Sequence, residues 1–285
     1  MGTLLALLSS VLWGTSDFLG GTASRRLSPI GVVVVSEAVG TIGPLGVAIA
    51  MGDLGTSPDY VGWAFLAAVS GSAGIVAFYR ALSTGTMGVV APIAALGVVV
   101  PVIVGVAQGD RPSGLQIAGI AVAISGVVLA SGPELAGAEG EHRRAAAMPL
   151  LLAVAAAAGF GVVFVALEHG ARTSTVMTLV VMRSVSVVLL LLVALVTGRE
   201  QLKVGRRDVP MLAVIGCFDV GANATFAYAS RHGLLSVVAV LSSLYPAVTA
   251  LLARSIHSER LRSVQVGGVV AALAGVCLIA AAGTG

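Results

Sequence analysis

Four ionisable residues lie deep inside segments that are otherwise apolar: Asp17, Glu37, Arg183 and Asp219. Their formal charges, three carboxylates and one guanidinium, sum to −2. A charge at the centre of a bilayer costs roughly 3 kcal/mol or more, so such residues usually face a cavity or one another. We therefore expect either that at least one acid is protonated or that a cation visits the site.

Asp219 and Asn223 stand four residues apart in the stretch IGCFDVGANATFAYAS, residues 215–230. Side chains at this spacing share one face of a helix. Phe226 continues that face, and Tyr228 stands at an adjacent angle. The pattern favours the wall of a cavity that binds a polar substrate or cycles a proton. The alternative is a mutual hydrogen bond between Asp219 and Asn223, packed against a neighbouring helix.

The composition is that of an integral membrane protein. Apolar residues make up 57% of the 285, charged residues only 10%, and the mean hydropathy is +1.03. Soluble domains contain about 45–50% apolar and about 25% charged residues. The net charge of +3 forms no basic face, because most basic residues lie between hydrophobic segments, and this excludes a nucleic-acid partner. We expect a multi-pass protein of the plasma (inner) membrane, in contact with the lipid bilayer.

Ten stretches are apolar enough to cross the bilayer, which takes about 20 residues each as a helix. Their apolarity runs all round, whereas barrel strands alternate with a period of two. The first stretch lacks the positive region of a signal peptide, so we interpret it as a helix. The sequence predicts an all-α integral membrane protein with ten transmembrane helices, over approximately residues 3–23, 29–51, 60–82, 85–108, 114–132, 147–170, 174–198, 208–231, 234–256 and 262–282.

The ten helices divide into two halves that resemble each other. Residues 78–129, moved by 149 positions onto 227–278, match at ten of 52 positions, seven of them in the last 20. We expect a first five-helix repeat at 1–132, a linker at 133–146 and a second repeat at 147–285. Because each repeat has an odd number of helices, the second must be inverted relative to the first, a 5+5 inverted repeat typical of transporters.

The remaining polar and aromatic candidates each allow two interpretations. Glu37 and Arg183 hold nearly equivalent positions in the halves, so we expect them to meet, as a structural ion pair or as part of a site. Asp17 either lines a cavity or hydrogen-bonds to helix ends at an interface. Trp13 lies too deep for the interfacial aromatic belt, which favours packing or a cavity. Tyr245, like Tyr79 and Tyr228, either lines the cavity or anchors at the membrane surface.

The stretch LYPAVTALLARSIHSERLRSVQVGGVVAALAGVCLI resembles the end of an EamA domain, with a proline, twelve residues, Glu-Arg and then Gln, Gly and Gly. VLWGTSDFLGG resembles the opening helix of that domain. The chain is therefore similar to two-repeat, ten-helix members of the drug/metabolite transporter superfamily, which implies a small-molecule substrate. The first copy departs from the pattern, with Gly97 in the place of Pro246 and Asp110 in the place of Glu259. We assign no substrate role to the Glu-Arg loops.

These observations favour a secondary transporter or exporter of small polar or amphipathic metabolites, working by alternating access, with proton coupling as one option. No HExxH, Walker or G-x-S-x-G motif occurs, and Cys217 and Cys277 lie in apolar segments, so we expect no enzyme, no cofactor and no metal. A membrane enzyme acting on lipid-linked substrates and a structural membrane subunit are the alternatives. Small residues at four-residue spacing, as in Gly119 and Ala123, suit close helix packing within the bundle or in a homodimer.

Loop charges predict an orientation. Twelve of the Lys and Arg residues fall on one side of the predicted helices and three on the other. Because basic loops stay in the cytoplasm, we expect the side with twelve to be cytoplasmic.

Overall fold

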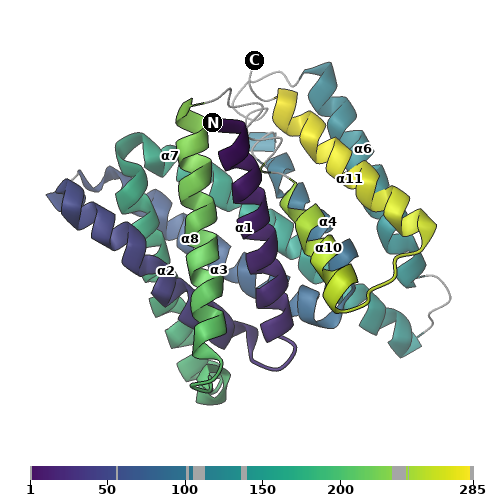
Figure 1. Cartoon of the computed structure of the whole chain (residues 1–285), viewed down its shortest axis with the longest axis horizontal. Helices are drawn as coiled ribbons and strands as arrows, with labels where there is room; N and C mark the ends of the chain where they lie inside the picture. Colours follow the sequence, from purple (N-terminus) through teal and green to yellow (C-terminus); the bar gives the residue numbers. More distant parts are fainter. Residues whose placement is uncertain are drawn as a thin grey trace.

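The computed structural model describes residues 2–55, 57–100, 103–104, 113–135, 140–232, 242 and 244–282. Throughout these residues the regular structure is helical (Figure 1). The longer helices are α1 Gly2–Ala23, α2 Pro29–Met51, α3 Val61–Thr84, α4 Met87–Ala94, α6 Gly114–Leu135, α7 Gly140–Thr197, α8 Val209–His232, α10 Tyr245–Ile256 and α11 Ser263–Ala282. Short 3-10 turns are η1 Asp53–Gly55, η2 Pro58–Tyr60, η3 Ala95–Val98 and η4 Arg199–Leu202.

Most of the helices lie where the hydropathy of the sequence predicts them. The helices α1, α2, α3, α6, α8 and α11 each cover one predicted stretch. In the described part, six helical stretches are long and apolar enough to cross a membrane: Leu4–Ala23, Pro29–Met51, Pro58–Thr84, Ala146–Leu167, Arg172–Thr197 and Val209–Phe226. The shorter apolar stretches are Met87–Gly97, Gly114–Gly126 and Ser263–Ile279.

Two predicted helices, 147–170 and 174–198, both belong to α7. Ser174 interrupts this element with non-helical dihedral angles, φ −155° and ψ 116°. The interruption separates two helices at the predicted boundary. At its other end α7 begins at Gly140, and α6 continues to Leu135, so helical structure extends from both sides into the segment expected to be the linker.

The predicted stretches 85–108 and 234–256 are described only in part. The first contains α4 and η3, and most of residues 101–112 lie outside the described residues. The second contains α10, while residues 233–241 lie outside the described residues. Pro246 stands in the first turn of α10, where the missing proline N–H would have had no helical acceptor.

The helices pack in a few extensive pairs. α3 lies along α7, α1 along α8, and α6 along α11, while α10 contacts both α1 and α4. Figure 1 shows α6 and α11 side by side at one edge of the bundle, on the side opposite α2. Glycines allow this approach: a Cβ added at Gly126 would collide with the backbone nitrogen of Ala272, and one at Gly275 with that of Ala123.

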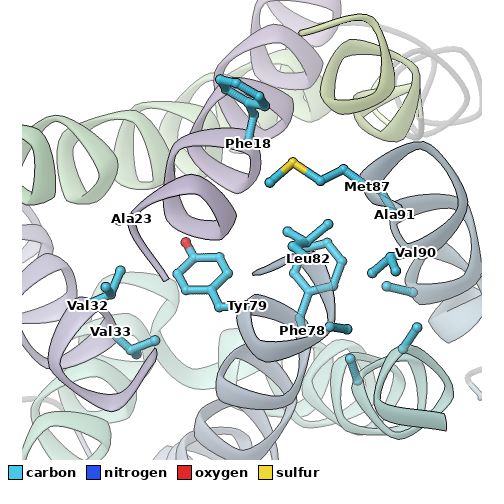
Figure 2. Close-up of a cluster of buried hydrophobic side chains, with 14 of the residues drawn as sticks. Phe18, Ala23, Val32, Val33, Phe78, Tyr79, Leu82, Met87, Val90 and Ala91 are labelled. Atoms are coloured by element: carbon cyan, nitrogen blue, oxygen red, sulfur yellow. The ribbon is translucent and has the colours of Figure 1, made fainter. Parts of the chain in front are cut away.

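The apolar core occupies the end of the bundle where α1 ends and α2 begins. Figure 2 shows Phe18, Leu82 and Met87 directed into the space between α1, α3 and α4. Tyr79 is buried in the same cluster, only 3% exposed. Tyr79 therefore belongs to the core, and the cavity described below lies further along the helices.

Candidate functional site

A buried arginine joins two acids from different helices. Arg183, in the second half of α7, is 3% exposed. Its Nη1 donates to Oε2 of Glu37 in α2 over 3.2 Å, and its Nη2 donates to Oδ2 of Asp219 in α8. The predicted pairing of Glu37 with Arg183 is confirmed. The third member, Asp219, was not predicted to join them, although an excess of acids over one cation was the signal that could have indicated it.

Glycines make room for this cluster. A Cβ at Gly40 of α2 would lie 3.1 Å from Nη1 of Arg183, and one at Gly216 of α8 would collide with the backbone oxygen of Ser36. α2 and α8 therefore approach each other closely beside the guanidinium. The Nε of Arg183 is buried and has no hydrogen-bond partner among the described residues.

A cavity of about 190 Å³ lies beside the cluster. Helices α1, α2, α3, α7, α8 and α10 all contribute to its wall. The polar side chains of the wall are Asp17, Glu37, Arg183, Ser186, Asp219 and Asn223. Aromatic rings of Trp13, Phe160, Phe164 and Tyr245 cover other parts of it. Seven of the eight sequence candidates, all but Tyr228, line this wall.

Asn223 uses its side chain locally. Its Nδ2 donates to the backbone oxygen of Asp219 over 2.7 Å. The alternative interpretation, a hydrogen bond between Asp219 and Asn223, is thus present with the backbone carbonyl as its acceptor, while the carboxylate of Asp219 binds Arg183. Phe226 contacts Trp13 on α1. Tyr228 lies in α8, but its side chain is outside the described part of the chain.

Asp17 differs from the other two acids. Among the described residues its carboxylate has no ion pair and no hydrogen bond, and the charged group that acts on it is the carboxylate of Asp219. Trp13, four residues earlier on α1, lies with its ring centroid 6.3 Å from that of Tyr245, in an edge-to-face arrangement at 70°. The same indole lies 5.8 Å from the ring of Phe226.

A second cavity, of about 410 Å³, begins at the same residues. Arg183 and Asn223 line both cavities. From there the second one extends along Val47 of α2 and Thr175 of α7. Val47 lies near the end of α2, so this cavity leads away from the apolar core.

Polar contacts cover the core at its own end. Arg25 pairs with Glu259 at 3.2 Å, and Arg26 pairs with Asp208 at 2.7 Å. Thr22 Oγ1 lies 2.9 Å from Nε2 of His257. Burial first and the nearby Arg25 guanidinium second lower the pKa of His257, against the opposite effect of Glu259. These contacts tie the end of α1 to the segment between α10 and α11 and to the start of α8.

The described residues contain no group of three His, Cys, Asp or Glu side chains placed to hold a metal ion. The cluster is therefore best described as an ion-pair network beside a cavity. Such a network can bind a small charged molecule, accept a proton on a carboxylate, or exchange one for the other.

Comparison with known proteins bears on the fold and on the family of the chain. A solved structure described as "Crystal structure of protein" is similar in fold, with a TM-score of 0.62 and 18% identity over 98% of this chain and 96% of the other. No curated protein sequence matches the chain. The family model described as the EamA-like transporter family matches residues 1–132 and 147–281, which confirms the resemblance noted in the sequence.

Proposed function

Because the chain belongs to the EamA-like transporter family, we propose that it is a secondary active transporter of small polar or amphipathic metabolites. It works by alternating access across the cell membrane and is coupled to protons. The observation that carries the proposal is a cavity within the bundle whose wall holds Arg183 between Glu37 and Asp219. Charged groups inside apolar helices are costly, and in membrane proteins they mark substrate and ion pathways.

The proposed architecture is ten transmembrane helices in a 5+5 inverted repeat. The packing supports it: α1 lies along α8, and α3 lies along the first part of α7. In the proposed repeat α1 corresponds to the first part of α7, and α3 corresponds to α8. A two-fold axis between the halves therefore converts the first contact into the second. α4 with α10 and α6 with α11 are contacts between equivalent helices. An in-plane pseudo-two-fold axis would produce this pairing, and in transporters of this kind the substrate site lies where the repeats meet.

The two ends of the cavity region differ in a way that suits alternating access. The apolar core and the Arg25–Glu259 and Arg26–Asp208 pairs cover one end. The 410 Å³ cavity leads from Arg183 toward the other end. Access to the site is therefore easier from the end opposite the core. The complementary state requires the two ion pairs to separate while the halves rock around the central site.

Asp219 links a proton to this movement. As a carboxylate it binds the guanidinium of Arg183, and protonation removes the charge that holds the two together. A charge-assisted hydrogen bond is roughly twice as strong as a neutral one, so proton binding loosens α8 from α7. Release of the proton on the other side restores the contact. Asp219 thus carries either one proton or the ion pair with Arg183, in alternation during the cycle.

The test is transport into sealed proteoliposomes with an imposed proton gradient. The substrate is first identified by comparing metabolites exported from cells with and without the protein. Asp219→Asn should abolish accumulation driven by the gradient while binding persists. The matched control is Glu200→Gln, since the side chain of Glu200 is 76% exposed, and it should transport normally. Unchanged accumulation by Asp219→Asn across a range of pH would remove Asp219 from the coupling, and absence of flux for every metabolite would remove the transport function.

A further inference from the structure

We propose that the cavity binds an organic cation, with the positive nitrogen beside Asp17 and against the rings of Trp13 and Tyr245. The inference rests on the proposed transport function and names the substrate class of the same site. It follows from the charge balance of the wall, from the arrangement of its aromatic rings and from its apolar remainder.

The charge balance of the wall is negative. Asp17, Glu37 and Asp219 contribute three carboxylates, and Arg183 is the one cationic side chain in the described lining. Both Nη atoms of Arg183 are already bound, one to Glu37 and one to Asp219. Asp17 has no such partner within the described residues, and its charged neighbour is another acid. A cationic ligand supplies the missing countercharge, whereas an anionic ligand would add to the repulsion.

The aromatic rings stand where a cation at Asp17 would meet them. Trp13 and Asp17 are four residues apart on α1, so they share one helical face. The ring of Tyr245 reaches the indole from α10, at a centroid distance of 6.3 Å. Indole and phenol faces attract cations, most strongly where water is excluded. A carboxylate beside two such rings matches an ammonium group better than it matches a hydroxyl or a carboxylate.

The position of Tyr245 is held by the backbone. Thr249 Oγ1 donates to the backbone oxygen of Gly14 over 3.1 Å, which binds α10 to α1. A Cβ at Gly14 would lie 2.5 Å from the backbone oxygen of Tyr245. Because α1 and α10 touch at this glycine, the tyrosine and the tryptophan stay together as one wall of the cavity.

The rest of the wall selects the body of the ligand. Ile75, Phe160, Phe164 and Met182 are apolar and line the same 190 Å³ cavity. This space suits a single aromatic ring joined to a small ammonium group. The substrate class is therefore a small amphipathic organic cation.

The cation and a proton exclude each other at Asp17. The titratable groups that act on it or on which it acts are Tyr79 of α3, Asp219 of α8 and Tyr245 of α10. Glu37 of α2 and Arg183 of α7 are the other charged groups in the same cavity wall. A protonated Asp17 offers no countercharge, so acid weakens cation binding.

A set of three ligands of similar shape tests charge selectivity. Benzyltrimethylammonium is the cation, 2-methyl-1-phenylpropan-2-ol the neutral counterpart, and 2,2-dimethyl-3-phenylpropanoate the anion. The chain contains two tryptophans, so Trp63→Phe leaves Trp13 as the sole tryptophan. Quenching of Trp13 fluorescence in the full-length protein in nanodiscs then reports binding at this wall.

We expect the cation to bind at least tenfold more tightly than the alcohol, and the anion to bind most weakly. Asp17→Asn should weaken cation binding at least tenfold and leave alcohol binding within twofold, which also shows that the variant is folded. Glu200→Gln is the matched control and should change neither. Equal affinities for the three ligands, or unchanged cation binding by Asp17→Asn, would overturn the inference.

A second variant serves if Asp17→Asn does not fold. Tyr245→Leu in the same Trp63→Phe background should weaken binding of the cation more than binding of the alcohol, because the substitution removes an aromatic ring and leaves an apolar surface. An equal loss for both ligands would overturn the inference. The binding assay requires no flux, so the proposed function is tested separately. Gradient-driven transport of a neutral or anionic metabolite would support a transporter and contradict a cation site. Cation binding without any flux would support the cation site and contradict the transport function.

Discussion

Removing Arg183 is the most direct test of the ion-pair network. Arg183→Met retains an unbranched side chain but deletes the guanidinium that two acids bind. Arg183 itself is only 3% exposed. Glu37 and Asp219 then remain as two unpaired carboxylates, with side-chain exposures of 19% and 34%. Breaking a buried pair by removing one partner costs about 3–5 kcal/mol. Because Asp219 retains some access to water, we expect about 3 kcal/mol, the lower end of that range.

The assay is reversible unfolding in mixed micelles, followed by helix content. Arg206→Met is the matched control, because Arg206 lies in an exposed connector and should change stability by less than about 0.5 kcal/mol. Adding Glu37→Gln to Arg183→Met removes one of the stranded charges. The double variant should recover roughly half of the loss, a coupling that only neighbouring residues display.

Two results would refute this reasoning. If Arg183→Met cost less than about 1 kcal/mol, the cluster would be hydrated enough for its charges to be worth little, as in exposed ion pairs. If the double variant were no more stable than the worse single variant, Glu37 and Arg183 would not interact in the folded protein.

Three further predictions follow from other parts of the chain. Reporters fused in the 52–58 and 199–207 connectors should lie on opposite sides of the membrane, with the basic 199–207 connector cytoplasmic, and an external 199–207 would contradict the charge argument. Gly126→Leu should cost about 1–3 kcal/mol through its collision with α11, measured by the same unfolding assay, whereas Gly267→Leu, with open space around it, should not. The pKa of His257 is lowered from 6.5, so the folded protein favours the neutral ring. The stability that depends on this neutral ring is complete above about pH 6.5 and is lost as the pH falls below it. The melting temperature should therefore drop between pH 7.5 and pH 5, less so in His257→Gln, and an equal drop in both would refute this.

Hydropathy predicted the helices because a span must be apolar along its whole length, whatever its neighbours are. The break at Ser174 was predicted in this way, since polarity rises locally between two apolar runs. The start of α7 at Gly140 was not predicted. Residues before the membrane can continue a helix in water, and hydropathy does not distinguish a polar helix from a polar loop.

The partners of the charged residues were only partly predictable. Glu37 and Arg183 could be paired from the sequence because the repeat places them at nearly equivalent positions. The contact from Arg183 to Asp219 depends on the rotation of α8 about its own axis, which the glycine contact between Gly216 and Ser36 sets. Asn223 bonds to the backbone of Asp219, since that carbonyl is the nearest acceptor one turn away on the same helix.

The choice between a structural ion pair and a functional one becomes less sharp once the helices are placed. Glu37 belongs to the first proposed repeat, whereas Arg183 and Asp219 belong to the second. A rocking motion between the repeats must therefore stretch or exchange the bond between Glu37 and Arg183, but it leaves the bond between Arg183 and Asp219 within one half. A ligand or proton that changes the charge beside Arg183 alters the balance between these two bonds. The ion pair between Glu37 and Arg183, which stabilises the fold, is thus also the contact whose strength the proposed transport cycle has to change.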